Sequence, residues 1–238
     1  MNKNNFFYVP IENDDTYCIQ ITFPIPFDFF DLRRICSVEY IENILSGGLG
    51  SRLYYATRTD LGAVYNIDAY AQYNFKNKKY NYFTIEAETD KEHLTHLYDR
   101  IILELGIIKE NDNITDKEIE QKKNIDSVEN EYNICSSSFQ KHVKFYKPFI
   151  VWGAPKRKSL CTLSKWLKLK ESITPDDIIE TSRMIFNPEA MKVYYSGKKP
   201  LFKGFQRHYS VAEGLAASPP SQPSHRPYGA ADPSGGGG

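Results

Sequence analysis

Two adjacent segments alternate apolar and polar side chains, and only a short polar stretch separates them. In the first, Val64 to Asn74, the alternation puts five side chains on one face: Tyr65, Ile67, Ala69, Ala71 and Tyr73. Tyr80 to Glu88 is a second segment of this kind, and Asn77-Lys-Lys between the two suits a turn. A period of two residues is typical of a half-buried β-strand. The pair therefore predicts a β-hairpin, which requires an antiparallel sheet in this part of the chain.

Periodicity elsewhere predicts further strands and helices. Apolar residues alternate again at Thr16 to Phe23, and a last strand is predicted at Met191 to Ser196. Helical spacing, together with start and stop signals, predicts four helices: Leu32 to Ser46, Leu94 to Ile108, Thr115 to about Phe139, and Thr174 to Asn187. This order of elements predicts an α+β fold with a mainly antiparallel sheet and helices packed on one face.

Charge and composition exclude several classes of protein. Thirty Lys and Arg residues balance thirty Asp and Glu residues, which argues against binding to nucleic acid or to an anionic membrane. No run of about 18 apolar residues predicts a transmembrane helix, and the first residues lack the pattern of a secretory signal. The four cysteines are far apart and lack C-x-x-C spacing: Cys18, Cys36, Cys135 and Cys161. We therefore expect a soluble protein with reduced thiols, in the cytoplasm or an organelle matrix.

The composition changes once, near Tyr209. Residues 209–238 are rich in Ser, Pro, Ala and Gly and end in four glycines. Such a segment cannot bury enough apolar surface to offset the entropy lost on ordering. We predict that 209–238 is a disordered tail, or a sequence appended to the natural chain, and that residues 1–208 form one domain.

The most informative stretch is Ile44 to Tyr65, ILSGGLGSRLYYATRTDLGAVY. A helix ends there in a glycine-rich turn, and Ser-Arg-Leu starts another helix before an arginine, a glycine and a tyrosine. The segment resembles the C-terminal, non-zinc-binding half of the insulinase (pitrilysin-type) zinc metallopeptidases, with the pattern L-G-G-G-x-x-S-R-L-x-x-x-x-R-x-x-x-G-x-x-Y. The matching residues are Leu45, Gly47, Gly48, Ser51, Arg52, Leu53, Arg58, Gly62 and Tyr65. The helix start at Thr115 and the closing helix and strand also resemble the family, so the similarity extends from about Tyr8 to Lys198.

The resemblance implies that this chain lacks the catalytic centre. In the zinc-binding half of the family, an H-x-x-E-H motif on the first long helix and a distal glutamate hold zinc and supply the general base. The equivalent helix here, Leu32 to Ser46, contains no histidine. Its Glu39 and Glu42 are a poor zinc site and are expected on a solvated face. We expect no catalytic residue and no metal in this chain, and zinc on a partner half.

The resemblance also implies two substrate-binding residues, Arg58 and Tyr65, beside a glycine-rich turn formed by Gly47, Gly48 and Gly50. A guanidinium can donate to a peptide carbonyl, and a phenol can donate to the oxyanion of a tetrahedral intermediate. The strand at Val64 to Asn74 could also offer an edge to an extended peptide. Residue type alone favours a surface helix cation for Arg58 and a core-facing strand residue for Tyr65, and only the spacing shared with the family makes the substrate-binding role equally favoured.

Three other features suggest chemistry but have simpler explanations. His93 and His96 share a helix face without a third metal ligand nearby, so a polar helix surface is favoured. Cys135-Ser-Ser-Ser138 lacks the strand-turn-helix setting of a nucleophile and is expected at a helix end or in a loop. Lys141 to Lys170 holds nine Lys or Arg residues and no acid, which is typical of a solvated helix face and also of a docking surface.

Two functional hypotheses follow. Under both, we expect no peptidase activity from this chain alone. In the first, the chain is the substrate-binding half of a two-part zinc metallopeptidase, and it binds an extended peptide with an H-x-x-E-H half on a separate chain or with a second copy. In the second, it is a structural or peptide-binding protein of the family with no proteolytic role. A chance match to an unrelated α+β domain is the third possibility.

Overall fold

The computed structural model describes residues 5–11, 15–28, 30–60, 62, 64, 66–74, 77–135 and 163–198. Five strands form one sheet: β1 (Phe6–Pro10), β2 (Tyr17–Pro24), β3 (Asn66–Gln72), β4 (Tyr82–Thr89) and β5 (Lys192–Gly197). Their order across the sheet is β1-β5-β2-β4-β3. All neighbours are antiparallel except β1 and β5, which run parallel. The predicted α+β class with a mainly antiparallel sheet is confirmed.

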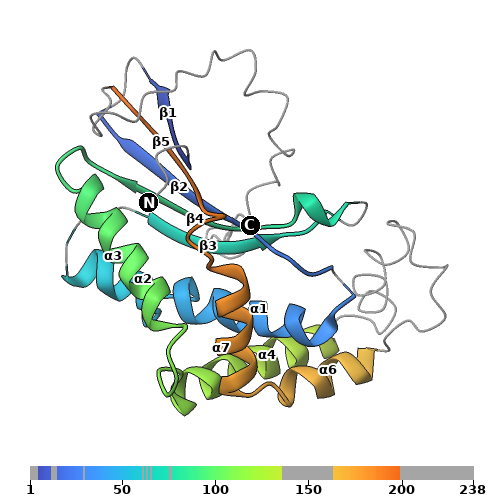
Figure 1. Ribbon diagram of the computed structural model, residues 1–238. Coiled ribbons are helices and arrows are strands. Elements are labelled where there is room, and N and C mark those ends of the chain that lie inside the picture. The colour runs from blue at the N-terminus through green and yellow to red at the C-terminus, as the bar shows by residue number, and fades with distance from the viewer. Residues whose placement is uncertain are drawn as a thin grey trace, which may run out of the picture.

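The described helices lie along one face of this sheet (Figure 1). They are α1 (Leu32–Ser46), α2 (Arg52–Tyr54), a π-helix (Tyr55–Asp60), α3 (Leu94–Ile107), α4 (Asp116–Cys135), α6 (Leu163–Glu171) and α7 (Pro175–Ile185). A short 3₁₀ helix, Lys78–Tyr80, makes the turn between β3 and β4. The structure thus adds β1 and α6, which the sequence analysis did not predict, and leaves the predicted segment 209–238 outside the described residues.

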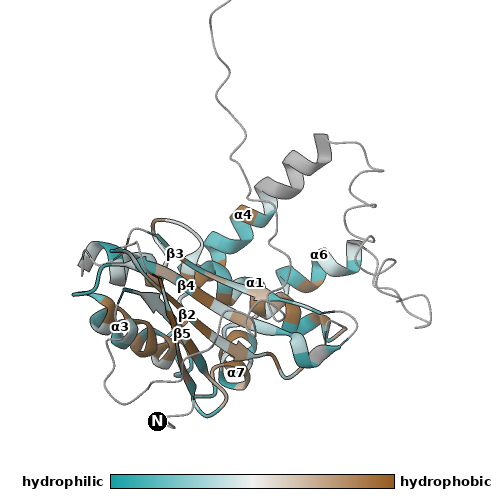
Figure 2. Cartoon of the chain, turned by 90° about the horizontal axis from the view of Figure 1, so that it is seen from above, coloured by the Kyte–Doolittle hydropathy of each residue, from teal (hydrophilic) through white to brown (hydrophobic). Residues whose placement is uncertain are grey.

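Every second side chain along the central strands points toward the helices and is buried in the hydrophobic core. Burial along β2 alternates residue by residue, as its period of two predicts. Phe23 and Phe83 from adjacent strands each meet Phe186 edge to face, with ring centroids 5.3 and 5.2 Å apart. Such pairs contribute about 0.5–1.5 kcal/mol beyond the burial of their area. Figure 2 shows hydrophobic residues on the strands and on α3 and α7, whereas α4 is largely hydrophilic.

Side-chain caps fix where two of the predicted helices begin. Thr174 and Asp177 form a reciprocal capping box at the start of α7, and Thr115 and Glu118 make the same contacts at the start of α4. Arg33 of α1 donates two hydrogen bonds to Asp177, which joins α1 to α7. Burial raises the pKa of the Asp177 carboxyl, but the hydrogen bonds from Arg33 and Thr174 outweigh it and lower that pKa below its ordinary value.

Candidate functional site

The glycine-rich turn follows directly from the end of α1. Gly47 donates its N–H to the carbonyl oxygen of Asn43 at 2.8 Å and so caps the helix. A Cβ on Gly47 would lie 2.5 Å from that same backbone oxygen, which leaves no room for another residue. Gly48 has φ +119°, a conformation that side chains strongly disfavour. These two positions therefore require glycine, whereas Gly50 has open space where a Cβ would lie.

Arg52 anchors this turn to a distant helix. Its guanidinium donates to both carboxylate oxygens of Glu118, at 2.6 and 2.9 Å, and also to the carbonyl oxygen of Asn113. Burial raises the pKa of the Glu118 carboxyl, but the hydrogen bonds from Arg52 and Thr115 outweigh it and the pKa is lowered. Arg52 therefore has a structural role in the motif, one that the sequence alone does not indicate because its partner lies 66 positions away.

Arg58 lies on the π-helix that follows α2. Its guanidinium carbon is 5.2 Å from the centre of the Tyr54 ring, within range of a cation–π interaction. Arg58 is exposed, and its carbonyl accepts the N–H of Gly62, which has φ +59°. Short π-helical turns are often found at functional sites. The second predicted substrate-binding residue, Tyr65, lies outside the described residues, so the spacing between the two side chains stays a prediction.

Side chains of α1 occupy part of the free edge of β3, the last strand of the sheet. Ser46 Oγ accepts the N–H of Ala69 at 2.8 Å and donates to the Ala69 carbonyl at 3.1 Å. Glu42 Oε1 accepts the N–H of Ala71 at 2.5 Å. The predicted edge strand is therefore present, but main-chain groups that an extended peptide would need at Ala69 and Ala71 are already hydrogen-bonded.

The expectation that both carboxylates lie on a solvated face is wrong for Glu42 and holds only in part for Glu39, whose side chain is 31% exposed. The carboxylate of Glu39 pairs with the ammonium of Lys170 from α6, which also lies 3.5 Å from Asp126. Glu42 is partly buried, and its carboxyl accepts the N–H of Ala71 on β3. Burial raises the pKa of this carboxyl to about 7, because it outweighs the lowering effect of that hydrogen bond. In the described residues, no three His, Cys, Asp or Glu side chains are grouped closely enough to hold a metal ion.

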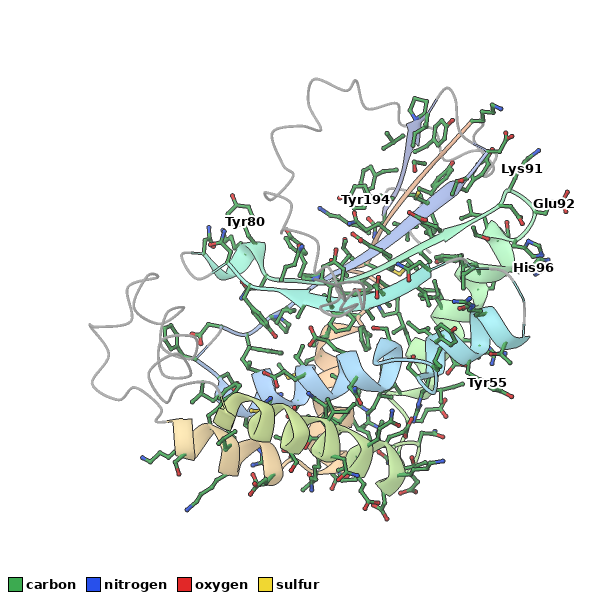
Figure 3. The ribbon with its side chains drawn as sticks, turned by 180° about the vertical axis from the view of Figure 1, so that it is seen from behind. Tyr55, Tyr80, Lys91, Glu92, His96 and Tyr194 are labelled. Atoms are coloured by element: carbon green, nitrogen blue, oxygen red, sulfur yellow. The ribbon has the colours of Figure 1, made fainter. Side chains whose placement is uncertain are left out.

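The remaining candidate residues are dispersed. His93 precedes α3 and bonds Asp90 through Nδ1 at 2.7 Å. Burial raises the Asp90 pKa, but that contact outweighs it and lowers the pKa. His96 is exposed on α3 and projects from the molecule (Figure 3). Cys135 ends α4, and residues 136–138 lie outside the described residues, as do residues 141–162 of the basic segment.

Among the helices that the structure describes, none is both long and apolar enough to cross a membrane.

The family model described as the peptidase M16 inactive domain matches residues 2–125. This match covers more than half of the 238 residues, so the chain belongs to that family, the C-terminal half-domain of the insulinase-type peptidases. The assignment makes it a non-catalytic, peptidase-like domain and fits the lack of histidine in α1.

Solved structures share the fold at low sequence identity. A protease from Helicobacter pylori superposes with a TM-score of 0.68 at 14% identity, over 82% of this chain and 44% of that one. A peptidase M16 inactive domain from Pseudomonas fluorescens gives 0.60 at 17%, over 82% and 43%. The inactive peptidase domain of a Bordetella parapertussis protein described as a zinc protease gives 0.58 at 9%, over 78% and 94%. The chain therefore spans less than half of the first two proteins.

Proposed function

We propose that this chain is the substrate-binding half of a two-part zinc metallopeptidase of the insulinase type, and that it completes the peptide chamber of an H-x-x-E-H partner. The observation that carries the proposal is its membership of the inactive-domain family together with the histidine-free helix α1. The chain spans 44% of the Helicobacter pylori protease that shares its fold, which fits one half of a larger enzyme.

Arg58 and Tyr65 are the residues assigned to the peptide. The guanidinium of Arg58 is exposed, and the Tyr54 ring below it restricts its orientation, so donors are presented outward at a reduced entropic cost. Tyr65 follows three positions after Gly62, whose left-handed turn redirects the chain between the two residues. In this role Arg58 holds a peptide carbonyl and Tyr65 donates to the developing oxyanion, while the partner's zinc supplies the Lewis acid.

The test is a peptidase assay of this chain reconstituted with an H-x-x-E-H half, using Arg58→Ala and Tyr65→Phe. We expect each change to lower kcat/KM by about 10- to 100-fold, because each removes a donor that acts on the substrate. Lys91→Ala and Tyr80→Phe are matched controls, since both residues are exposed and remote from the π-helix (Figure 3). Pairing is measured separately by analytical ultracentrifugation. If activity survives both changes with pairing intact, these residues do not bind substrate.

A second candidate function is a structural protein of the same family with no proteolytic role. The hydrogen-bonded N–H groups of Ala69 and Ala71 favour it. They lie on β3, an edge strand of the described sheet, and an added peptide strand could not pair with them there. The two functions separate in the same experiment. A structural subunit would pair with its partner and would leave turnover unaffected by Arg58→Ala, whereas a substrate-binding half would not.

A further inference from the structure

Two side chains of α1 hold the edge strand β3, which lies over that helix in Figure 1. Ser46 accepts the main-chain N–H of Ala69, and Glu42 accepts that of Ala71. The two contacts differ in one respect. The serine hydroxyl keeps its proton at any physiological pH, whereas the carboxyl of Glu42 can be neutral or charged. One attachment of the edge is therefore fixed, and the other depends on a proton.

Glu42 belongs to a cluster of charged groups from three helices. The other members are Glu39 on α1, Lys122 and Asp126 on α4, and Lys170 on α6. Lys122 Nζ lies 2.6 Å from Asp126 Oδ1. Lys170 Nζ contacts a carboxylate oxygen of Glu39 and lies 3.5 Å from Asp126 Oδ1. The side chains of Lys122, Asp126 and Lys170 are 12%, 10% and 17% exposed, so little water reaches the cluster.

The charges of this cluster balance only while Glu42 carries a proton. The two ammonium groups face the carboxylates of Glu39 and Asp126, and no described residue forms an ion pair with Glu42. Lys170 remains a cation: burial alone would lower its pKa, but the carboxylate of Glu39 outweighs burial and raises it. Ionisation of Glu42 therefore adds a partly buried negative charge without a partner, which costs free energy.

Every element around Glu42 contributes to its charge state. Burial is the largest influence on its pKa and raises it, against the hydrogen bond from Ala71, which lowers it. The carboxylate of Glu39 raises the pKa further, and the ammonium groups of α4 and α6 lower it, with a net value of about 7. After the end of β3, burial raises the pKa of the Tyr73 phenol, and the charge of Glu42 raises it further. Tyr73 therefore stays neutral where Glu42 titrates.

We propose that Glu42 is a proton-dependent latch between α1 and the end of β3. The neutral carboxyl holds the Ala71 N–H, whereas the ionised carboxylate turns toward water and releases it. Ser46 keeps Ala69 attached in both states, so the release is confined to the Ala71 end of the strand. An unpaired N–H at the edge of a sheet is free to pair with another chain. The latch therefore regulates whether this end of the edge is closed, and it does not depend on the proposed peptidase function.

The direction of the pH dependence follows from the two states. With the latch closed, Glu42 has a pKa of about 7, and in the open state the carboxyl is exposed to water and has its ordinary pKa of 4.5. The open state therefore binds fewer protons between these two values, so the opening equilibrium rises about tenfold for each pH unit there. Below pH 4.5 the closed latch is most stable, and above pH 7 the opening equilibrium no longer changes.

The test is amide hydrogen exchange of the full chain, followed by NMR at Ala71 and Ala69 between pH 5 and 7. Comparison with the exchange rate of an unstructured amide gives a protection factor, which measures local opening. We expect the Ala71 protection factor of the parent to fall about 30- to 100-fold over this range. In Glu42→Gln, which keeps an acceptor and cannot ionise, it should stay constant. Ala69, held by Ser46, should change less than about threefold in both proteins.

Glu120→Gln is the matched control, because it removes an exposed carboxylate from α4 and should follow the parent. A second measurement needs no variant: carbon-13 NMR of the side-chain carboxyls of the parent should show one glutamate that titrates near pH 7. A constant Ala71 protection factor in the parent would overturn the proposal. Equal falls in the parent and in Glu42→Gln, or equal falls at Ala71 and Ala69, would also overturn it, because α1 and β3 would then separate without Glu42 acting as a latch.

Discussion

At the scale of single residues, Glu42 is the side chain with the clearest pH dependence. Burial raises its pKa to about 7 in the folded chain, against an ordinary value of 4.5. The folded state therefore holds this proton more tightly than the unfolded state does. The stabilisation is complete below the ordinary pKa and is lost as pH rises through about 7.

Glu42→Gln keeps an acceptor for the Ala71 N–H and removes the charge. We expect parent and variant to have similar free energies of unfolding near pH 5, and the variant to be more stable by up to about 3 kcal/mol near pH 8.5. Urea denaturation at the two pH values measures this. Glu120→Gln, on the exposed side of α4, should follow the parent at both. A pH profile of Glu42→Gln parallel to that of the parent would show that Glu42 ionises normally.

At the scale of elements, the hydrogen bonds from Arg52 to Glu118 join the glycine-rich turn to α4. Removal of its guanidinium leaves Glu118 partly buried without its principal partner, and it also frees the Asn113 carbonyl. We expect Arg52→Ala to lower the free energy of unfolding by about 2–4 kcal/mol. The control is Lys117→Ala, which removes an exposed cation next to Glu118 on α4 and should lower the free energy of unfolding by less than about 0.5 kcal/mol. Chemical denaturation measures both, and equal losses would exclude an anchoring role.

Local sequence signals predicted the elements that have strong boundaries. The helix at Leu32–Ser46 was predicted with the bounds that the structure shows, because apolar residues recur at helical spacing and Gly47 terminates the run. The strand β1 lacks such a signal, since Phe7 is buried on the face where alternation requires a polar residue. Helix α6 is hidden in lysine-rich sequence, although its Trp166 and Leu169 pack against the core.

The sequence identifies several residues of the candidate site, but it does not show which residues they contact. Glycines at 47 and 48 and the arginine at 58 are recognisable from their spacing, and the turn geometry explains the two glycines. The Tyr54 ring under Arg58 is only four positions away, so an i, i+4 search could have found it. The Ser46 contact with Ala69 joins elements 23 positions apart in the sequence, and only the folded packing of α1 on β3 reveals it.

At the scale of the whole molecule, the decisive property is that a peptidase-family fold lacks histidine on α1, the helix that the family resemblance aligns with the zinc-binding helix. Zinc requires three or four suitable ligands within about 2.0–2.3 Å, and the carboxylates on this helix are engaged by Lys170 and by β3. We expect the purified chain to retain less than about 0.1 zinc per molecule after dialysis and to hydrolyse no peptide by itself. Elemental analysis and a peptide-library assay measure these two properties, and a reconstituted H-x-x-E-H partner is the positive control for both. Zinc bound in a one-to-one ratio, and lost together with turnover on substitution of His93 and His96, would place a metal centre in this chain and contradict the division of labour between two halves.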